Sequence, residues 1–280
     1  MSQSTPRRQR DLAGLLLTGL TVICAALWFF PVYWAIATSL RFDQDTVTDF
    51  GLIPKNPTLS AYMFNIENSR LLTWYFNSTV VSVSVTVVAV FVAACTGYAI
   101  SQLTFPGRKL LWWTILASFM VPVSALIVNH FIIVAGLGLL NSYLGIILPM
   151  LLTPVTVIVY KQFFDGLPRD FREAAVMDGA TEFQLLFRVF LPMNWGVTTA
   201  LAIITFIGAW NSFLWPFLAA QDETMMTVTV GITAVQDAFG VAYGRVLSGA
   251  VLAGLPVALA YLFFQRRVTQ AITLSAGIKG

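Results

Sequence analysis

Charged side chains are scarce in this sequence. Asp, Glu, Lys and Arg together make up 10% of its 280 residues, whereas they are about a quarter of a typical water-soluble protein. Hydrophobic residues make up 58% of the chain, and so little polar surface could not cover a globule in water. The composition argues against a soluble fold and predicts an all-α, polytopic membrane protein with lipid as its main solvent.

Residues that catalyse reactions or hold metals are also few. His130 is the single histidine, and the two cysteines, Cys24 and Cys95, both lie in apolar stretches. These residues cannot supply a disulfide framework, a metal site or a nucleophile with its base. A Gly-x-x-x-x-Gly-Lys-Ser/Thr phosphate loop is missing too. We therefore expect no catalytic residue, no metal and no cofactor on this chain, and we expect that it is not an enzyme. If ATP–Mg is used, a partner polypeptide must bind it.

Long windows without charge predict the membrane-spanning helices. About 20 apolar residues cross the hydrocarbon of a bilayer, and a window that is long enough for two crossings contains a Gly- and Asn-rich turn at 136–142. The result is six predicted spans, which cover residues 15–40, 74–103, 111–137, 143–164, 195–219 and 247–267.

Basic residues fix the predicted orientation. Of the 16 Lys and Arg, only Arg41, Lys55, Arg70 and Arg245 fall on the side of the predicted membrane away from the termini. The positive-inside rule then places both termini in the cytoplasm. The predicted layout is a cytoplasmic tail at 1–14, a retained first span rather than a cleaved signal peptide, an outer segment at 41–73, a membrane core at 74–267 and a cytoplasmic tail at 268–280.

The loop at 165–194 is the polar segment that carries most information. Asp170 is expected to cap a short helix with Glu173 at its third position, and Gly179 to end that helix in a left-handed conformation. Thr181 and Gln184 predict a second capping box. The helix that begins there is expected to end at Pro192.

Paired alanines distinguish the first of these helices. Ala174 and Ala175 occupy an element that is predicted to face the cytoplasm, where long polar side chains are the ordinary choice. Small side chains let the surface of another protein approach the backbone closely. The alternative is a solvated loop that is merely rich in good helix formers.

The motif Glu173-Ala-Ala-x-x-x-Gly179, followed by Val189-x-Leu191-Pro192, resembles the "EAA" loop of the membrane subunits of ATP-binding-cassette (ABC) importers. Val189 stands where that family usually has Ile. The resemblance implies that the first helix docks in a cleft of a cytoplasmic ATPase. It assigns ATPase coupling to Asp170, Glu173, Ala174, Ala175, Gly179, Leu191 and Pro192.

Further segments resemble the shorter, six-span permease of maltose-type carbohydrate importers. They include Phe30–Ser39, Asn77-Ser78, Gly97–Arg108 and Trp210–Phe213, although Ser212 replaces the acidic residue usual after Trp-Asn. The C-terminal residues 276–280 are similar to the Gly-Ala-Val-Lys-Gly ending of that subunit but differ at the first three positions. This similarity implies a contact of Lys279 and Gly280 with the ATPase.

The resemblance implies a type I ABC importer (MetI-like) transmembrane fold in a bacterial inner membrane, with residues 74–267 as the ABC transmembrane core. The implied partners are a second, homologous permease in a heterodimer, two copies of an ABC ATPase and an extracytoplasmic solute-binding protein. The chain would contact the lipid bilayer and no nucleic acid. The implied solute is a sugar or sugar-like molecule, and a disaccharide, amino sugar, polyol, glycerol phosphate or sulfonated sugar all fit.

An ion-coupled secondary carrier or a uniporter, whose cytoplasmic loop binds a regulator, is the alternative. Such carriers use ionisable groups at membrane depth, but none of the 13 carboxylates falls inside the predicted spans. Asn129, His130 and Asn211 are candidates to line a polar path, and each also fits a role in helix packing.

Overall fold

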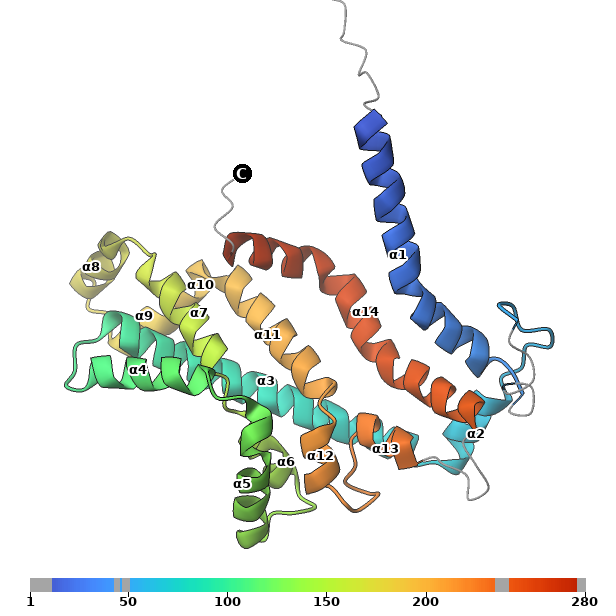
Figure 1. Ribbon diagram of the computed structural model, residues 1–280. Helices are drawn as coiled ribbons and strands as arrows, with labels where there is room; N and C mark the ends of the chain where they lie inside the picture. The colour runs from blue at the N-terminus through green and yellow to red at the C-terminus, as the bar shows by residue number, and fades with distance from the viewer. Residues whose placement is uncertain (1–11, 43–45, 47–50, 235–241, 276–280) are drawn as a thin grey trace, which may run out of the picture. The chain divides into compact units, whose positions relative to one another are not determined.

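Helices account for the regular structure in the described part of the chain. The computed structural model describes residues 12–42, 46, 51–234 and 242–275, and this part contains helices and turns without a strand. The expectation of an all-α protein is confirmed. Three helices are long and apolar enough to cross a membrane by themselves. They are α1 (Leu12–Ser39), α3 (Leu71–Gln102) and α14 (Tyr243–Ser275), and Figure 1 shows them in blue, cyan and red.

Shorter helices make up the rest of the described chain. They are α2 (Ser60–Asn68), α4 (Arg108–Phe119), α5 (Val123–Gly136), α6 (Tyr143–Met150), α7 (Pro154–Asp165), α8 (Arg169–Met177), α9 (Glu182–Leu185), α10 (Leu191–Met193), α11 (Trp195–Trp210), α12 (Leu214–Ala219) and α13 (Val228–Ala234). A π-helical segment, η1 (Leu186–Phe190), lies between α9 and α10.

Several predicted spans are bent. The predicted span at 111–137 consists of α4 and α5, which meet at an angle of 102°, and the one at 143–164 consists of α6 and α7, which meet at 49°. Pro122 directly precedes α5 and Pro154 is the first residue of α7, and proline has no N–H to continue the helix before it. A third pair, residues 182–193 with α11, is bent by 85°, so that up to six spans result if each pair counts as one.

Contacts divide the chain into two units. The smaller comprises residues 1–69 and 235–252, and the larger comprises residues 70–234 and 253–280. In the smaller unit, Asn65 is buried, and its side-chain Nδ2 donates hydrogen bonds of 2.8 Å to both the Ser248 hydroxyl and the Arg245 carbonyl. The Arg245 guanidinium lies 3.8 Å from the centre of the Phe64 ring. These contacts join α2 to the start of α14.

Helix α3 is the central element of the larger unit. Its main packing partners are α7 and α11. Small residues permit the close approach, since Ala89 and Ala93 are both 1% exposed. A Cβ on Gly97 would lie only 2.8 Å from the Cβ of Tyr160 on α7. Small residues at an interface allow helix backbones to approach in a membrane, where the hydrophobic effect does not drive helices together.

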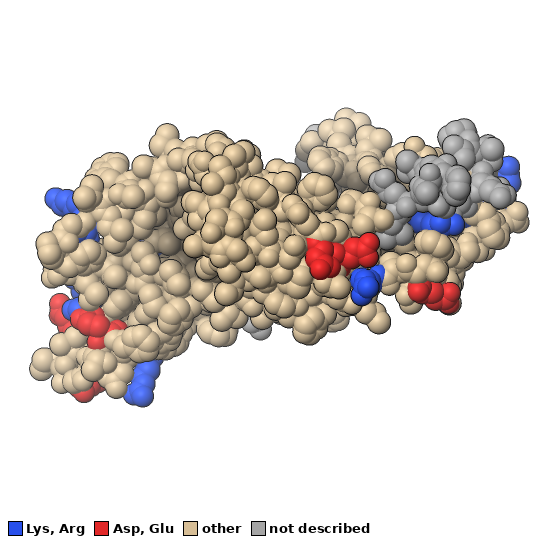
Figure 2. All heavy atoms as spheres, turned by 90° about the horizontal axis from the view of Figure 1, so that it is seen from below, with Lys and Arg blue, Asp and Glu red and all other residues tan. Residues whose placement is uncertain are grey.

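The charged side chains of the larger unit are unevenly distributed. On the face shown in Figure 2 they gather at the end where α4 begins and α8 lies in Figure 1, and a second charged group lies farther along, with a broad uncharged region between the two. Such a division is typical of a helical unit whose middle lies in hydrocarbon.

Candidate functional site

The first helix of the coupling loop starts two residues earlier than predicted. Asp170 was expected to cap it, but α8 begins at Arg169, the capping position is Pro168, and no side chain caps the helix. Pro168 has an extended backbone (φ −57°, ψ 137°), so the helix begins at the next residue without a side-chain cap. Asp170 instead lies in the first turn, where a carboxylate interacts favourably with the helix dipole.

Gly179 ends α8 as predicted. Its φ of +80° is in the left-handed region. The N–H of Gly179 donates to the carbonyl of Val176 at 2.9 Å, and the N–H of Ala180 donates to that of Ala175 at 3.0 Å. These two bonds form a Schellman motif, which satisfies the last carbonyls of a helix.

The two alanines of α8 face different environments. Ala174 is exposed, whereas Ala175 is half-buried and packs on the core of the unit. We expected both to face a partner, but Ala175 is turned towards the core, and of the two only Ala174 is accessible to a partner. Phe171, three residues before Ala174, is 47% exposed, and Met177, three residues after it, is 87% exposed. Residues three apart share a helix face, so α8 exposes an apolar stripe formed by Phe171, Ala174 and Met177.

The second helix of the loop begins with the predicted capping box. The Thr181 hydroxyl accepts a hydrogen bond from the Gln184 N–H at 3.3 Å, and the Gln184 side chain accepts one from the Thr181 N–H at 2.9 Å. The helical path then passes through the π-helix η1 and ends at Met193, one residue beyond the predicted Pro192. Leu191 is half-buried against the core and Pro192 is exposed.

A polar anchor ties the loop to α3. The Tyr98 hydroxyl donates a 2.5 Å hydrogen bond to Oε2 of Glu182, and Arg172 on α8 pairs with Oε1 of the same carboxylate. One carboxylate thus links α3, α8 and α9. Sequence reasoning missed this anchor, because Tyr98 lies 84 positions from Glu182 and belongs to an apolar span.

Aromatic rings pack beneath the anchor. The Tyr98 ring meets the rings of Phe164 and Phe190 edge-on, with centroid distances of 6.2 and 5.1 Å, and Phe164 stacks on Tyr160 at 5.4 Å. All four side chains are nearly inaccessible to solvent. Edge-to-face and stacked pairs of this kind are favourable beyond the area that they bury. The cluster connects η1 rigidly to α3 and α7.

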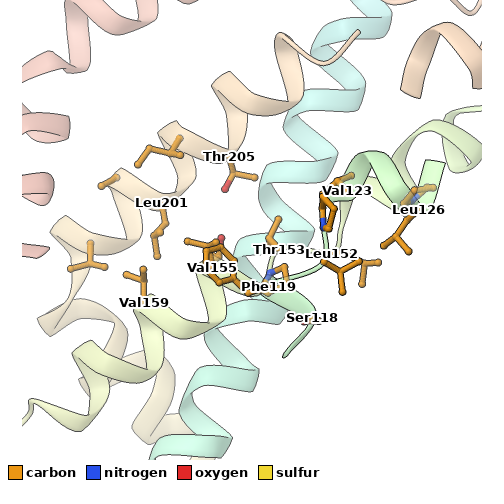
Figure 3. A pocket seen from close by; sticks show the side chains of 18 of the residues that line it. Ser118, Phe119, Val123, Leu126, Leu152, Thr153, Val155, Val159, Leu201 and Thr205 are labelled. Atoms are coloured by element: carbon orange, nitrogen blue, oxygen red, sulfur yellow. The ribbon is translucent and has the colours of Figure 1, made fainter. Parts of the chain in front are cut away.

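A separate cleft opens where the bent helix pairs break. Its volume is about 730 Å³, and it is lined by residues of the α4–α5 break, the α6–α7 break and α11. Figure 3 shows side chains such as Phe119, Thr153 and Thr205 around this space. The lining is predominantly apolar, with Ser118, His130, Thr153, Thr156 and Thr205 as its polar side chains.

The predicted path-lining residues do not come together. His130 lies on the cleft, edge-on to Trp215 at 5.9 Å. Asn129 and Asn211 are exposed and are not among the residues that line it. Among the described residues no group of His, Cys, Asp or Glu could hold a metal ion. Lys279 and Gly280 lie outside the described residues.

At the other end of α3, side chains hold the segment at 220–229. The buried Asn77 donates from Nδ2 to the carbonyls of Thr224 and Met226 at 2.8 and 2.9 Å, and its Oδ1 accepts a bond from the Tyr143 hydroxyl at 2.7 Å. The Ser78 hydroxyl accepts a bond from the N–H of Val228 at 2.8 Å. Asn77 and Ser78 belong to a segment that resembles maltose-type permeases. Here their side chains hold the segment at 220–229 against α3.

The same segment contains Asp222, which lies outside the predicted spans. Among the carboxyl groups of the described residues, its pKa is the one that is clearly shifted. The backbone N–H and the hydroxyl of Thr224 donate to Asp222 at 2.9 and 2.8 Å, and these bonds lower the pKa of Asp222. Hydrogen bonds to the ionised form are the physical cause.

Taken together, the bent apolar helices and the anchored polar loop define a membrane-embedded transport subunit. The model of the family "Binding-protein-dependent transport system inner membrane component" matches residues 18–273. The chain belongs to this family. It is therefore an inner-membrane permease subunit of a binding-protein-dependent importer, not an enzyme.

Relatives and solved structures agree with this assignment. The chain is 32% identical to the arabinooligosaccharides transport system permease protein AraQ of Bacillus subtilis, over 97% of this chain and 98% of the relative. It is 34% identical to the sulfoquinovosyl glycerol transport system permease protein SmoH of Agrobacterium fabrum, over 90% and 89%. A chain of a bacterial ABC transporter that imports alginate has the same fold, with a TM-score of 0.82 and 22% identity over 94% of this chain and 99% of that one. The expected class of protein is confirmed, and the alternative of an ion-coupled carrier is not supported.

Proposed function

We propose that this permease forms half of the translocation path for a sugar or sugar-like solute and couples to a cytoplasmic ATPase through α8. The observation that carries the proposal is the exposed apolar stripe of Phe171, Ala174 and Met177 on a helix anchored at its base. A solvated helix would place polar side chains there, so the stripe fits a protein partner. Relatives that transport arabinooligosaccharides and sulfoquinovosyl glycerol support the solute class.

The proposed assembly contains a second, homologous permease, two copies of the ATPase and an external solute-binding protein. ATP–Mg binds to the ATPase copies, and this chain binds no cofactor of its own. Glu173, Gly179, Leu191 and Pro192 shape the loop that docks. Lys279 and Gly280 provide a further contact with the ATPase. In support of an external binding protein, a related solved transporter for alginate is described in complex with a periplasmic protein that carries an alginate pentasaccharide.

In the proposed mechanism, closure of the ATPase pair moves α8, and the anchor carries that movement to the spans. Arg172 and Glu182 fix α8 to α9, and Tyr98 fixes Glu182 to α3. Because the aromatic cluster beneath is tightly packed, displacement of α8 is transmitted to α3 and α7 rather than absorbed locally. The two ends of the path then open alternately, since ATP binding favours one global state over the other.

Photo-cross-linking tests the docking surface. A photoreactive amino acid at position 174 should capture the ATPase in membranes, whereas the same group at Leu72, which is 79% exposed on α3, should not. Ala174→Trp should reduce solute uptake while ATP hydrolysis continues and expression is normal. Capture of the ATPase from both positions, from neither, or undiminished uptake by Ala174→Trp contradicts the assignment. The solute class is tested by identifying which solute the cognate binding protein retains.

A further inference from the structure

A second pocket lies at the start of α4, away from the cleft and the coupling loop. It has a volume of about 710 Å³ and is lined by residues of the α3–α4 turn, the first part of α4 and α7. Its lining includes three cations, Arg108, Lys109 and Lys161, together with the aromatic ring of Trp112. Nothing in the proposed coupling mechanism uses these residues.

The pocket is electropositive. Lys161 forms a 2.5 Å ion pair with Asp165 and lies 4.7 Å from the centre of the Trp112 ring. Arg108 is held by the carbonyls of Leu103 and Ser101, at 2.8 and 3.2 Å. Within the described ranges, neither Arg108 nor Lys109 pairs with a carboxylate, so about two positive charges remain uncompensated. No side chain caps the start of α4, which adds a partial positive charge at the same place.

The rim of the pocket is apolar and exposed. Leu110, which lines the pocket, is 72% exposed, and Trp113 on the next part of α4 is 66% exposed. Tryptophan is enriched where the hydrocarbon of a bilayer meets its headgroups. Cations beside exposed apolar side chains match the two parts of an anionic phospholipid, a phosphate and its acyl chains.

We propose that this pocket binds the headgroup of an anionic phospholipid, with the phosphate near Arg108 and Lys109 and the acyl chains along Leu110 and Trp113. Basic pockets between membrane helices on the cytoplasmic side recognise such headgroups, and the positive-inside rule predicts that this end faces the cytoplasm. A free anion has no apolar part that could contact the rim. The exposed leucine and tryptophan therefore favour a lipid over soluble phosphate.

Native mass spectrometry of the purified, delipidated importer complex tests the proposal. Phosphatidylglycerol should bind more tightly than phosphatidylcholine, and Lys109→Gln should weaken phosphatidylglycerol binding by about fivefold, the usual effect of one basic residue near an anionic membrane. Lys109→Arg should retain it. Lys109 is the residue to change because it is exposed, whereas Arg108 also holds backbone carbonyls.

The matched control is Arg188→Gln, which removes one exposed positive charge from the same predicted side of the membrane but outside the pocket. It should leave lipid binding unchanged. Equal losses in the Lys109 and Arg188 variants would show general surface electrostatics and overturn the proposal. Equal binding of the two lipids, or displacement of phosphatidylglycerol by millimolar inorganic phosphate, would overturn it as well.

Discussion

The hydroxyl of Tyr98 and the carboxylate of Glu182 lie 2.5 Å apart, although 84 positions separate the two residues in the chain. This hydrogen bond links a membrane-spanning helix directly to the second helix of the coupling loop. Its removal should therefore affect the transmission of movement more than the fold.

Tyr98→Phe keeps the ring and deletes the hydroxyl. A hydrogen bond to a charged acceptor contributes about 1.5–3 kcal/mol, and because Glu182 is half-exposed we expect a loss at the lower end, about 1.5–2 kcal/mol in thermal unfolding. Uptake should fall while ATP hydrolysis continues. Tyr33→Phe is the control, since its hydroxyl makes an exposed 2.8 Å bond to the Leu52 carbonyl. Equal uptake in both variants would contradict a role for the anchor.

Gly179→Ala should impair coupling through backbone strain. A side chain in the left-handed region costs about 1–2 kcal/mol, although a Cβ at Gly179 would meet nothing within 4 Å. Asn adopts this conformation more readily, so Gly179→Asn should retain more uptake than Gly179→Ala. Gly166→Ala provides the control in the same loop, because Gly166 has a φ of −77°. If Gly166→Ala is the more harmful change in uptake assays, the strain explanation is wrong.

Gly231→Ala should destabilise the end of the larger unit near α13. An added Cβ would lie 2.1 Å from the ring of Trp74, and overpacking of this kind costs about 1–3 kcal/mol. Gly208→Ala on α11 is the matched control, because a Cβ there meets nothing within 4 Å and alanine favours the helix by about 0.5–1 kcal/mol. In detergent, the midpoint of thermal unfolding should be lower for Gly231→Ala than for the unaltered protein, and equal or higher for Gly208→Ala.

Asn77→Asp should strongly weaken the attachment of the segment at 220–229. It replaces a donor of two hydrogen bonds with an oxygen that faces two carbonyls, at a position that is 2% exposed. Unsatisfied buried polar groups cost about 1–3 kcal/mol each, so we expect a loss of about 3 kcal/mol or more. Faster proteolysis between 220 and 229 would report it. Asn68→Asp, at an exposed side chain, should be neutral. Comparable proteolysis of the two variants would contradict the role of Asn77 in holding the segment at 220–229.

Local chemistry explains which features the sequence predicts. Gly179 and the Thr181–Gln184 capping box depend on residues within a few positions, and both were predicted correctly. The cap at Asp170 was wrong because Pro168 fixes the helix start without side-chain help. The environment of Ala175 and the contact of Tyr98 with Glu182 depend on how distant helices pack. Hydropathy carries no information on such pairings, and it also could not show that α4 and α5 meet at 102°.

The π-helix at Leu186–Phe190 restricts what can change in this part of the chain. In a π turn, residues five apart lie above one another, and Leu185 and Phe190, 0% and 2% exposed, both face the core. In an uninterrupted α-helix the same two side chains would point about 140° apart. Replacing one apolar side chain by another of similar volume preserves this alignment, whereas deleting a single residue turns either Leu185 or Phe190 towards solvent. The segment should therefore tolerate conservative substitutions but not insertions or deletions.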